Sequence, residues 1–230
     1  VKGFLAYFQA FTNTYAPVEK LREVYDQAMS YPEIIGMSIG TRPDCVPEEV
    51  IDLIASYTVE KPEVWVEYGL QSAHFRTLKK INRAHGVADF VDAVLRTKKR
   101  SSIKICVHVI LGLPDEDYDD MMETAKLIAA LPIDGIKIHP LHIVKHTTME
   151  KQYYKGEIKE LDLKDYAKLV VDFLSYLPKD IIVHRITGEA SEEELIAPYW
   201  CSPKYKMEVL KAIEEEFKLR NANQNLKLVV

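Results

Sequence analysis

The chain has 230 residues, of which 47% are hydrophobic and 28% are charged, and its formal net charge is −5. This composition excludes a disordered chain and does not suggest a strongly basic nucleic-acid-binding protein. No apolar run reaches the roughly 18 residues of a membrane span, and the N-terminus lacks a signal-peptide pattern. Cys45, Cys106 and Cys201 are scattered, which predicts neither a disulfide framework nor a metal site. We therefore expect a cytoplasmic protein with no membrane contact.

Apolar runs alternate with helical patterns along the first 150 residues. The apolar runs lie at 4–11, 34–44, 63–72, 103–114 and 135–144. Helices are predicted from Pro17, from Pro47, after the third run to about Lys99, and over 115–131. The first helix should bury one stripe, which consists of Val18, Leu21, Val24 and Ala28.

The pattern changes after the fifth run. A helix capped by Asp162 is predicted, followed by a short strand within 180–188, a loop with Trp200 and a final amphipathic helix. The first of these helices has one apolar face, formed by Tyr166, Leu169, Val170, Phe173, Leu174 and Leu177. We divide the chain into a core at 1–150 and an extension at 151–230 that packs on the same domain.

Near-continuous apolar strands separated by helices predict an α/β fold with a parallel sheet covered on both faces. A doubly wound sheet and a βα barrel, complete or partial, both fit this order. In either fold, functional groups gather at the C-terminal ends of the strands. The unusual polar residues of this chain fall there, at 9–13, 41–44, 67–72, 108–114 and 139–146.

Four motifs at these strand ends resemble the radical S-adenosylmethionine (SAM) superfamily. They are TRPDC at 41–45, VEYGLQS at 66–72, INRAHG at 81–86 and HVILGLP at 108–114. With YFQAFTNTYAP at 7–17, GIKIHPLH at 135–142 and IVHRITGE at 182–189, the chain is most similar to the YhcC-like branch, which is related to the Elongator catalytic subunit. The resemblance implies a partial (β/α)6 TIM-like barrel. It also implies an enzyme that generates a 5′-deoxyadenosyl radical from SAM with a [4Fe–4S] cluster, for modification of tRNA wobble uridines.

The sequence departs from this family in one respect. Family members hold the cluster with a loop of three cysteines after the first strand, because thiolates are its ligands. These residues contain no such loop. We interpret the chain as the second to sixth strands, with the first strand and the cluster cysteines upstream, and expect the 230 residues alone to be inactive. The alternative is a degenerate member that never had the loop, which would leave a sheet edge to be covered in some other way.

The resemblance assigns the SAM site to strand-end residues. Gln71 and Arg83 match the amide and the arginine that contact the ribose and the methionine carboxylate, a pairing that suits both groups. Glu67 would accept from the SAM amino group, pair with Arg42 in an interior ion pair, or do both. The predicted cofactor-binding residues are Gln9, Asn13, Thr41, Arg42, Glu67, Gln71, Arg83, Ile110 and Leu113, the last two beside the adenine.

Some of these residues also have ordinary structural interpretations. Arg83 could be a surface residue of a helix, and Gln71 could be an N-terminal cap. The Gly-Leu-Pro turn after Ile110 could be ordinary core. Gly40 stands where tRNA-modifying relatives often have a glutamate, and Asp44 is expected to cap the next turn.

The substrate is expected to contact basic residues at the open mouth, namely His108, His139, His142, Lys145, His184 and Arg185. His139 and His142 should lie on opposite faces of a strand, which argues against a metal site. For contact with tRNA phosphates and bases, the basic and aromatic segment 145–159 is favoured over 96–104. The other predicted partner is an electron donor such as flavodoxin or ferredoxin, and the oligomeric state is not predicted.

Two other functions stay open. One is a lyase-like βα-barrel enzyme that uses Lys137 or His108 as a base. The other is a non-catalytic scaffold that binds a nucleotide or RNA.

Overall fold

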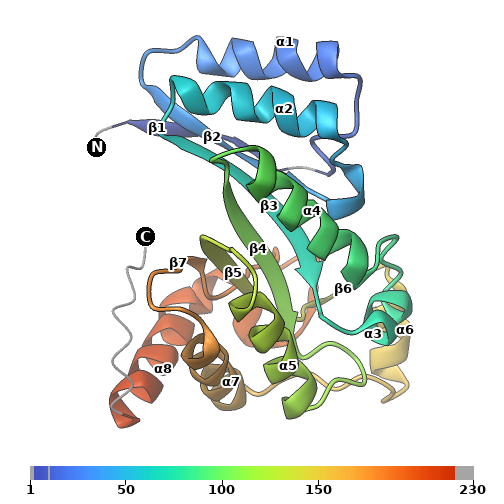
Figure 1. Cartoon of the computed structure of the whole chain (residues 1–230). Helices are drawn as coiled ribbons and strands as arrows, with labels where there is room; N and C mark the ends of the chain where they lie inside the picture. The colour runs from blue at the N-terminus through green and yellow to red at the C-terminus, as the bar shows by residue number, and fades with distance from the viewer. Residues whose placement is uncertain (1–2, 10, 221–230) are drawn as a thin grey trace. The chain divides into compact units, whose positions relative to one another are not determined.

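The computed structural model describes residues 3–9 and 11–220 (Figure 1). Within these residues, a six-stranded sheet has the order β1-β2-β3-β4-β5-β7, and β6 and β8 form a two-stranded sheet. The strands are β1 (Phe4–Phe8), β2 (Ile34–Thr41), β3 (Glu63–Gln71), β4 (Lys104–Leu111), β5 (Gly135–Pro140), β6 (Ile143–Val144), β7 (Ile182–Arg185) and β8 (Leu195–Ala197). The helices are α1 (Val18–Met29), α2 (Glu48–Ser56), α3 (Phe75–Lys80), α4 (Val87–Arg100), α5 (Tyr118–Ala129), α6 (Thr148–Tyr154), α7 (Leu163–Tyr176) and α8 (Lys206–Leu219).

The chain folds into two compact units that alternate along the sequence. The first unit contains the residues up to Leu70, together with Arg83–His108 and Leu131–Gly135. The second contains Gln71–Asn82, Val109–Ala130 and the residues from Ile136 onward. The division at residue 150 that the sequence suggests stays a prediction.

In the first unit, β1, β2 and β3 are parallel, and β3 is buried along its length from Val64 to Leu70. Such a strand is the continuous apolar run that the sequence predicts for a sheet covered on both faces. Helices α1 and α2 lie side by side over β1 and β2 (Figure 1). The register pairs Gly40 with Glu67 and Thr41 with Tyr68, which aligns the C-terminal ends of β2 and β3.

Helix α1 buries Leu21 as predicted, but the rest of its buried stripe differs from the predicted one. Leu21, Tyr25 and Met29 are buried, whereas Val24 is 41% exposed. Tyr25 determines the rotation of the helix about its axis. Its ring packs edge-on against the Phe8 ring, with 5.1 Å between the ring centroids, and its hydroxyl donates to the Asn13 carbonyl at 2.8 Å. A large aromatic ring buries more apolar area than valine, so the helix turns toward it.

The helix predicted to continue to about Lys99 is two helices, α3 and α4. The break contains Asn82, which has a φ of 56°, and Gly86, which is the N-cap of α4. The Gly86 amide donates to the Asp89 carboxylate at 2.6 Å, which is one half of a capping box. The break places Arg83 and His85 in an irregular segment instead of on a helix surface.

The second unit is built around α5, α7 and α8, with α7 packing against both of the other helices (Figure 1). Asp162 caps α7 as predicted, since its carboxylate accepts from the Lys164 amide at 2.8 Å. Trp200 is buried, and its indole N–H donates to the Leu161 carbonyl at 3.1 Å. In the described ranges, no helix combines the length and the apolar character that a membrane crossing needs.

Gly36 allows β2 and β3 to approach closely. A Cβ atom at Gly36 would lie 1.8 Å from the Glu63 carbonyl oxygen, whereas one at Gly40 would meet its nearest atom at 3.3 Å. We expect Gly36→Ala to lower the free energy of unfolding by about 2–4 kcal/mol, because the strands must separate, and Gly40→Ala to lower it by less than about 1 kcal/mol. Urea denaturation of both variants measures this difference. Equal midpoints for the two variants would contradict the close approach.

Candidate functional site

Glu67 on β3 is a buried carboxylate around which polar side chains of the first unit gather. The residue is 2% exposed. Its Oε1 accepts from the Ser38 hydroxyl at 2.6 Å, and its Oε2 accepts from the Tyr7 hydroxyl at 3.1 Å. The Nε2–H of His108 also donates to Oε2, at 2.7 Å. Side chains from β1, β2 and β4 therefore converge on one carboxylate of β3, which supplies the hydrogen bonds that a buried charge requires.

Arg42 does not pair with Glu67, so the predicted interior ion pair is wrong. Its guanidinium instead binds Asp44, with Nε 3.0 Å from Oδ1 and Nη2 2.5 Å from Oδ2. This pairing lowers the pKa of Asp44. The two residues lie in and beside the short turn Pro43–Cys45, where a bidentate pair forms locally without burying a charge. Asp44 accordingly binds Arg42, and α2 begins after Pro47 with no side-chain cap.

Arg83 is a half-buried guanidinium with no ion pair among the residues that the structure describes. Its Nη2 donates to the Gly69 carbonyl at 3.3 Å, and its Nε donates to His85 Nε2 at 3.2 Å. Burial lowers the pKa of Arg83 and repulsion by Arg42 lowers it further, whereas attraction by the Asp44 carboxylate acts in the opposite direction. A desolvated cation without a carboxylate partner is costly, so this position favours an anionic ligand group.

His85 orients Arg83, and the sequence interpretation missed it. His85 is 3% exposed, and burial lowers its pKa, which keeps the ring neutral. Its Nε2 accepts from Arg83, while Nδ1–H donates to the Gly86 carbonyl at 3.3 Å. The signal was present, because His85 belongs to the INRAHG motif. The sequence interpretation also missed Tyr7 and Ser38. For Ser38 there was a signal, because this polar residue interrupts an apolar run.

Asn13 and Thr41 hold the ends of β1 and β2 in place. The Asn13 amide donates to the Phe8 carbonyl at 3.0 Å and to the Gly40 carbonyl at 2.9 Å. Thr41 is buried and shares a hydrogen bond with Thr14 at 2.6 Å. Gln9 is exposed. The assignment of Gln9, Asn13 and Thr41 to a cofactor stays a prediction.

In the second unit, the residues after β3 and β4 are linked by a buried contact. Gln71 ends β3 with a φ of 70°, a left-handed conformation that non-glycine residues adopt mainly where the surroundings hold them. The next residue, Ser72, is fully buried and donates to Glu116. Burial raises the pKa of Glu116. Leu113 is buried and Ile110 is half-buried, and their assignment to the adenine stays a prediction.

His139 and His142 lie together, so the prediction that they face opposite sides is wrong. A Cβ atom at Gly188 would lie 2.6 Å from His139 Nδ1 and 2.8 Å from His142 Cε1, which places both rings against this glycine. The reason is that β5 ends at Pro140, and the alternation of strand faces ends with it. Burial lowers the pKa of His142. His184 is half-buried on β7, and Arg185 and Lys145 are exposed.

The described residues do not fit a [4Fe–4S] cluster. Cys45 is half-buried and Cys106 and Cys201 are buried, each on a different element. Burial raises the pKa of Cys201 to about 12, the opposite of what a thiolate ligand needs. Nor does any group of three metal-binding side chains meet in the part of the chain that the structure covers.

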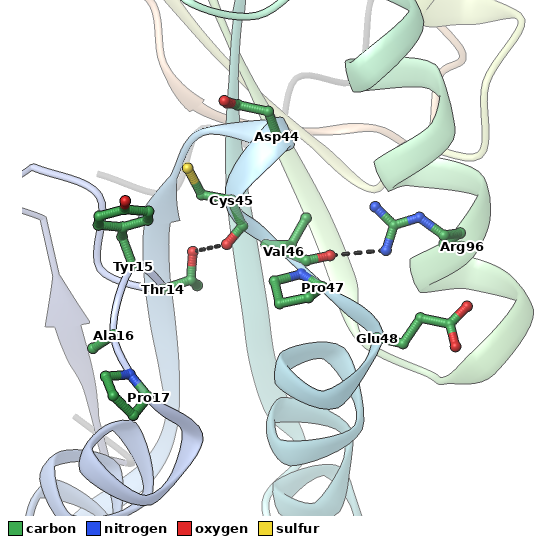
Figure 2. A pocket seen from close by; sticks show the side chains of 10 residues that line it. All are labelled: Thr14, Tyr15, Ala16, Pro17, Asp44, Cys45, Val46, Pro47, Glu48 and Arg96. Atoms are coloured by element: carbon green, nitrogen blue, oxygen red, sulfur yellow. Dashed lines mark hydrogen bonds between the residues drawn. The ribbon is translucent and has the colours of Figure 1, made fainter.

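A cavity of about 790 Å³ lies in the first unit beside the ends of β1 and β2 (Figure 2). Its lining contains none of the predicted cofactor or substrate residues. The ten lining residues are Thr14, Tyr15, Ala16, Pro17, Asp44, Cys45, Val46, Pro47, Glu48 and Arg96.

Comparison with known proteins identifies the family. The Radical SAM superfamily matches residues 5–128, and the Radical_SAM C-terminal domain matches 133–218. The chain is 48% identical to the uncharacterized protein YtqA of Bacillus subtilis, over 96% of the chain and 67% of YtqA. It is 42% identical to protein YhcC of Escherichia coli, over 89% of the chain and 66% of YhcC. This chain belongs to the radical SAM superfamily, as the strand-end motifs predict, and spans about two thirds of the length of these relatives.

Two more distant similarities concern the fold and the Elongator branch. The structure of Methanocaldococcus infernus Elp3 with an N-terminal deletion matches with a TM-score of 0.71 and 19% identity, over 90% of this chain and 47% of Elp3. This match confirms the predicted α/β fold class, the partial barrel of the radical SAM type. A Methanocaldococcus infernus protein named tRNA uridine(34) acetyltransferase is 26% identical over 66% of this chain and 28% of that protein.

Removing the negative charge of Glu67 should destabilise the first unit. We expect Glu67→Gln to lower the free energy of unfolding by about 2–4 kcal/mol, because the amide has one acceptor oxygen in place of the two carboxylate oxygens that accept from three donors. The control is Glu49→Gln, which changes an exposed glutamate and should shift stability by less than about 0.5 kcal/mol. Urea denaturation provides the measurement, and equal effects of the two substitutions would contradict the network.

Glu116 should make stability depend on pH. Its folded-state pKa is raised by burial, so its stabilising contribution is complete below the unfolded value of about 4.3 and is lost as pH rises through the folded pKa. Glu116→Gln should therefore gain stability relative to the wild type as pH rises across this window. Exposed Glu193→Gln is the matched control. Unfolding free energies from pH 4 to 8 test this, and parallel curves for Glu116→Gln and the wild type would contradict it.

Proposed function

We propose that the whole protein is a radical SAM enzyme that generates a 5′-deoxyadenosyl radical from SAM and acts on a wobble uridine of tRNA. Membership of the radical SAM superfamily supports the first part. When bound, SAM and a [4Fe–4S] cluster supply the radical that abstracts a substrate hydrogen atom. Because the described residues do not fit the cluster, its ligands belong elsewhere in this proposal, and the roles below concern only this chain's own side chains.

The observation that carries the SAM assignment is the unpaired guanidinium of Arg83. The group is half-buried, is held by His85 and the Gly69 carbonyl, and has a lowered pKa. A ligand carboxylate would supply the counter-charge that the described residues do not, in the bidentate geometry that arginine favours. The methionine end of SAM carries such a carboxylate.

The other predicted residues have roles that follow from their settings. Gln71 would offer its amide to the ribose hydroxyls, and the half-buried Ile110 would pack against the adenine. Glu67 has its oxygens engaged by Ser38, Tyr7 and His108 and is hardly accessible. We therefore assign Glu67 to orienting Tyr7 and His108, and assign contact with substrate to His108, His139, His142 and His184.

The tRNA part of the proposal is supported by similarity to the protein named tRNA uridine(34) acetyltransferase and by one surface. In the segment 145–159, Lys145, Lys151, Lys155 and Lys159 are exposed, and Tyr154 is 71% exposed. This combination suits phosphates and unstacked bases. The competing segment 96–104 has most of its cations in ion pairs, which are Arg96–Asp92, Lys98–Asp134, Arg100–Glu48 and Lys104–Glu63.

Electron delivery by a flavodoxin or ferredoxin and a cytoplasmic location complete the proposal. Anaerobic reconstitution of the full-length protein, followed by assay for 5′-deoxyadenosine under reducing conditions, tests it. Absence of 5′-deoxyadenosine from reconstituted protein would overturn the radical SAM assignment and leave the lyase-like barrel enzyme or the nucleotide- or RNA-binding scaffold.

Loss of the Arg83 charge should weaken SAM binding. For full-length Arg83→Gln we expect the Kd for SAM to rise about 10- to 150-fold, the effect of removing a charge-assisted hydrogen bond. Arg100→Gln, which changes a cation already paired with Glu48 and Asp52, is the control and should leave the Kd within about twofold. Calorimetric titration measures both, and a Kd unchanged in Arg83→Gln would refute the carboxylate contact.

Charge reversal in α6 and just after it should weaken tRNA binding. Lys151→Glu with Lys155→Glu should lower the affinity and reduce the slope of log K against log salt by roughly 0.7–0.9 for each phosphate that the protein no longer neutralises. The control is Lys211→Glu with Lys218→Glu on exposed positions of α8. Filter binding at several salt concentrations provides the comparison, and identical slopes for the two double variants would exclude this surface.

A further inference from the structure

The cavity in Figure 2 has a position suited to ligand binding but no role in the SAM site. Thr14–Pro17 of the β1–α1 loop form one wall, Asp44–Glu48 between β2 and α2 form another, and Arg96 reaches in from α4. All three segments belong to the first unit. Loops that follow parallel strands are the usual place for ligands in α/β folds, and a volume of about 790 Å³ falls in the ordinary range of ligand pockets.

The charges around this cavity are already neutralised. Asp44 is bound to Arg42, Glu48 to Arg100, and Arg96 to Asp92. Arg96 also donates to the Val46 carbonyl at 2.8 Å, as the dashed line in Figure 2 shows. A net-charged ligand would find no unmatched counter-charge among the residues that line this cavity, so the cavity favours a neutral one.

The remaining polar atoms are neutral as well. The Thr14 hydroxyl donates to the Cys45 carbonyl at 2.5 Å (Figure 2). Burial raises the pKa of Cys45, which keeps its side chain in the thiol form. A neutral ligand matches this set.

One exposed aromatic ring stands at the cavity. Tyr15 is 81% exposed although it lines the pocket, and the rest of the apolar lining consists of Ala16, Pro17, Val46 and Pro47. Phe11, on the same loop, is 99% exposed. Flat aromatic rings left in water beside a pocket are the platforms on which single-stranded bases stack.

We propose that this cavity receives one unstacked nucleobase of the RNA substrate, with its ring on Tyr15. The cavity shares no lining residue with the assigned SAM contacts. The inference rests on the proposed function, because it takes the partner to be RNA.

Tyr15 variants of the full-length protein test the stacking. Tyr15→Ala should weaken tRNA binding about 5- to 150-fold, the range for loss of one stacking ring. Tyr15→Phe keeps the ring and should stay within about threefold of the wild type. The matched control is Tyr31→Ala, which removes a 59% exposed tyrosine of the same unit outside the cavity and should have no effect.

Cys45 gives a direct measure of occupancy, because it lines the cavity whereas Cys106 and Cys201 are buried. Alkylation of full-length protein near pH 8.5, read residue by residue by mass spectrometry, should modify Cys45 and should be slowed at least fivefold by saturating tRNA. Tyr15→Ala at the same tRNA concentration should lose that protection. Protection by SAM alone, or equal Cys45 alkylation rates with and without saturating tRNA, would overturn the proposal.

The outcomes separate this inference from the proposed function. If wild-type protein does not bind tRNA, both fail. If tRNA binds and the α6 variants weaken it, but Tyr15→Ala does not, only the nucleobase pocket is overturned.

Discussion

The burial of one carboxylate constrains the first unit. Glu67 is 2% exposed, and a charge placed there costs several kcal/mol unless donors surround it. Ser38, Tyr7 and His108 supply those donors from the strands on either side. A slip of β3 by one residue would turn Glu67 to the opposite face and leave the donors without a partner. The network therefore fixes the register that pairs Gly40 with Glu67, and with it the positions of the strand ends.

Two arginines near these strand ends differ in whether a carboxylate pairs with them. We use this difference to separate a structural arginine from one that is suited to bind a ligand. Arg42 is held in a local bidentate pair with Asp44 and needs nothing further. Arg83 is more buried and donates a hydrogen bond to neutral His85. Among the described residues, no carboxylate forms an ion pair with it. Burial of the Arg83 guanidinium is the main reason that an incoming anion would be favoured, because the repulsion by Arg42 is opposed by attraction from Asp44. The same reasoning disfavours the cations of 96–104 as RNA contacts, because most of them are already paired.

The sequence by itself determined the alternation of strands and helices, the family and the set of strand-end motifs. It could do so because apolar periodicity, caps such as Asp162 and short motifs are local properties. The motif INRAHG even contained His85, which orients Arg83. What it could not supply was the rotation of α1, since the burial of Tyr25 depends on Phe8 from a different strand.

Only the tertiary structure decided which polar groups meet. The interior pair of Glu67 with Arg42 was chemically reasonable, but strand neighbours gave Glu67 other donors, and a tight turn gave Arg42 a closer acid. His139 and His142 lie together because the chain leaves β5 at Pro140, a bend that spacing alone does not reveal. The cavity at Tyr15 likewise comes from segments about 30 and 80 residues apart. Such contacts depend on how distant segments pack, which no local pattern encodes.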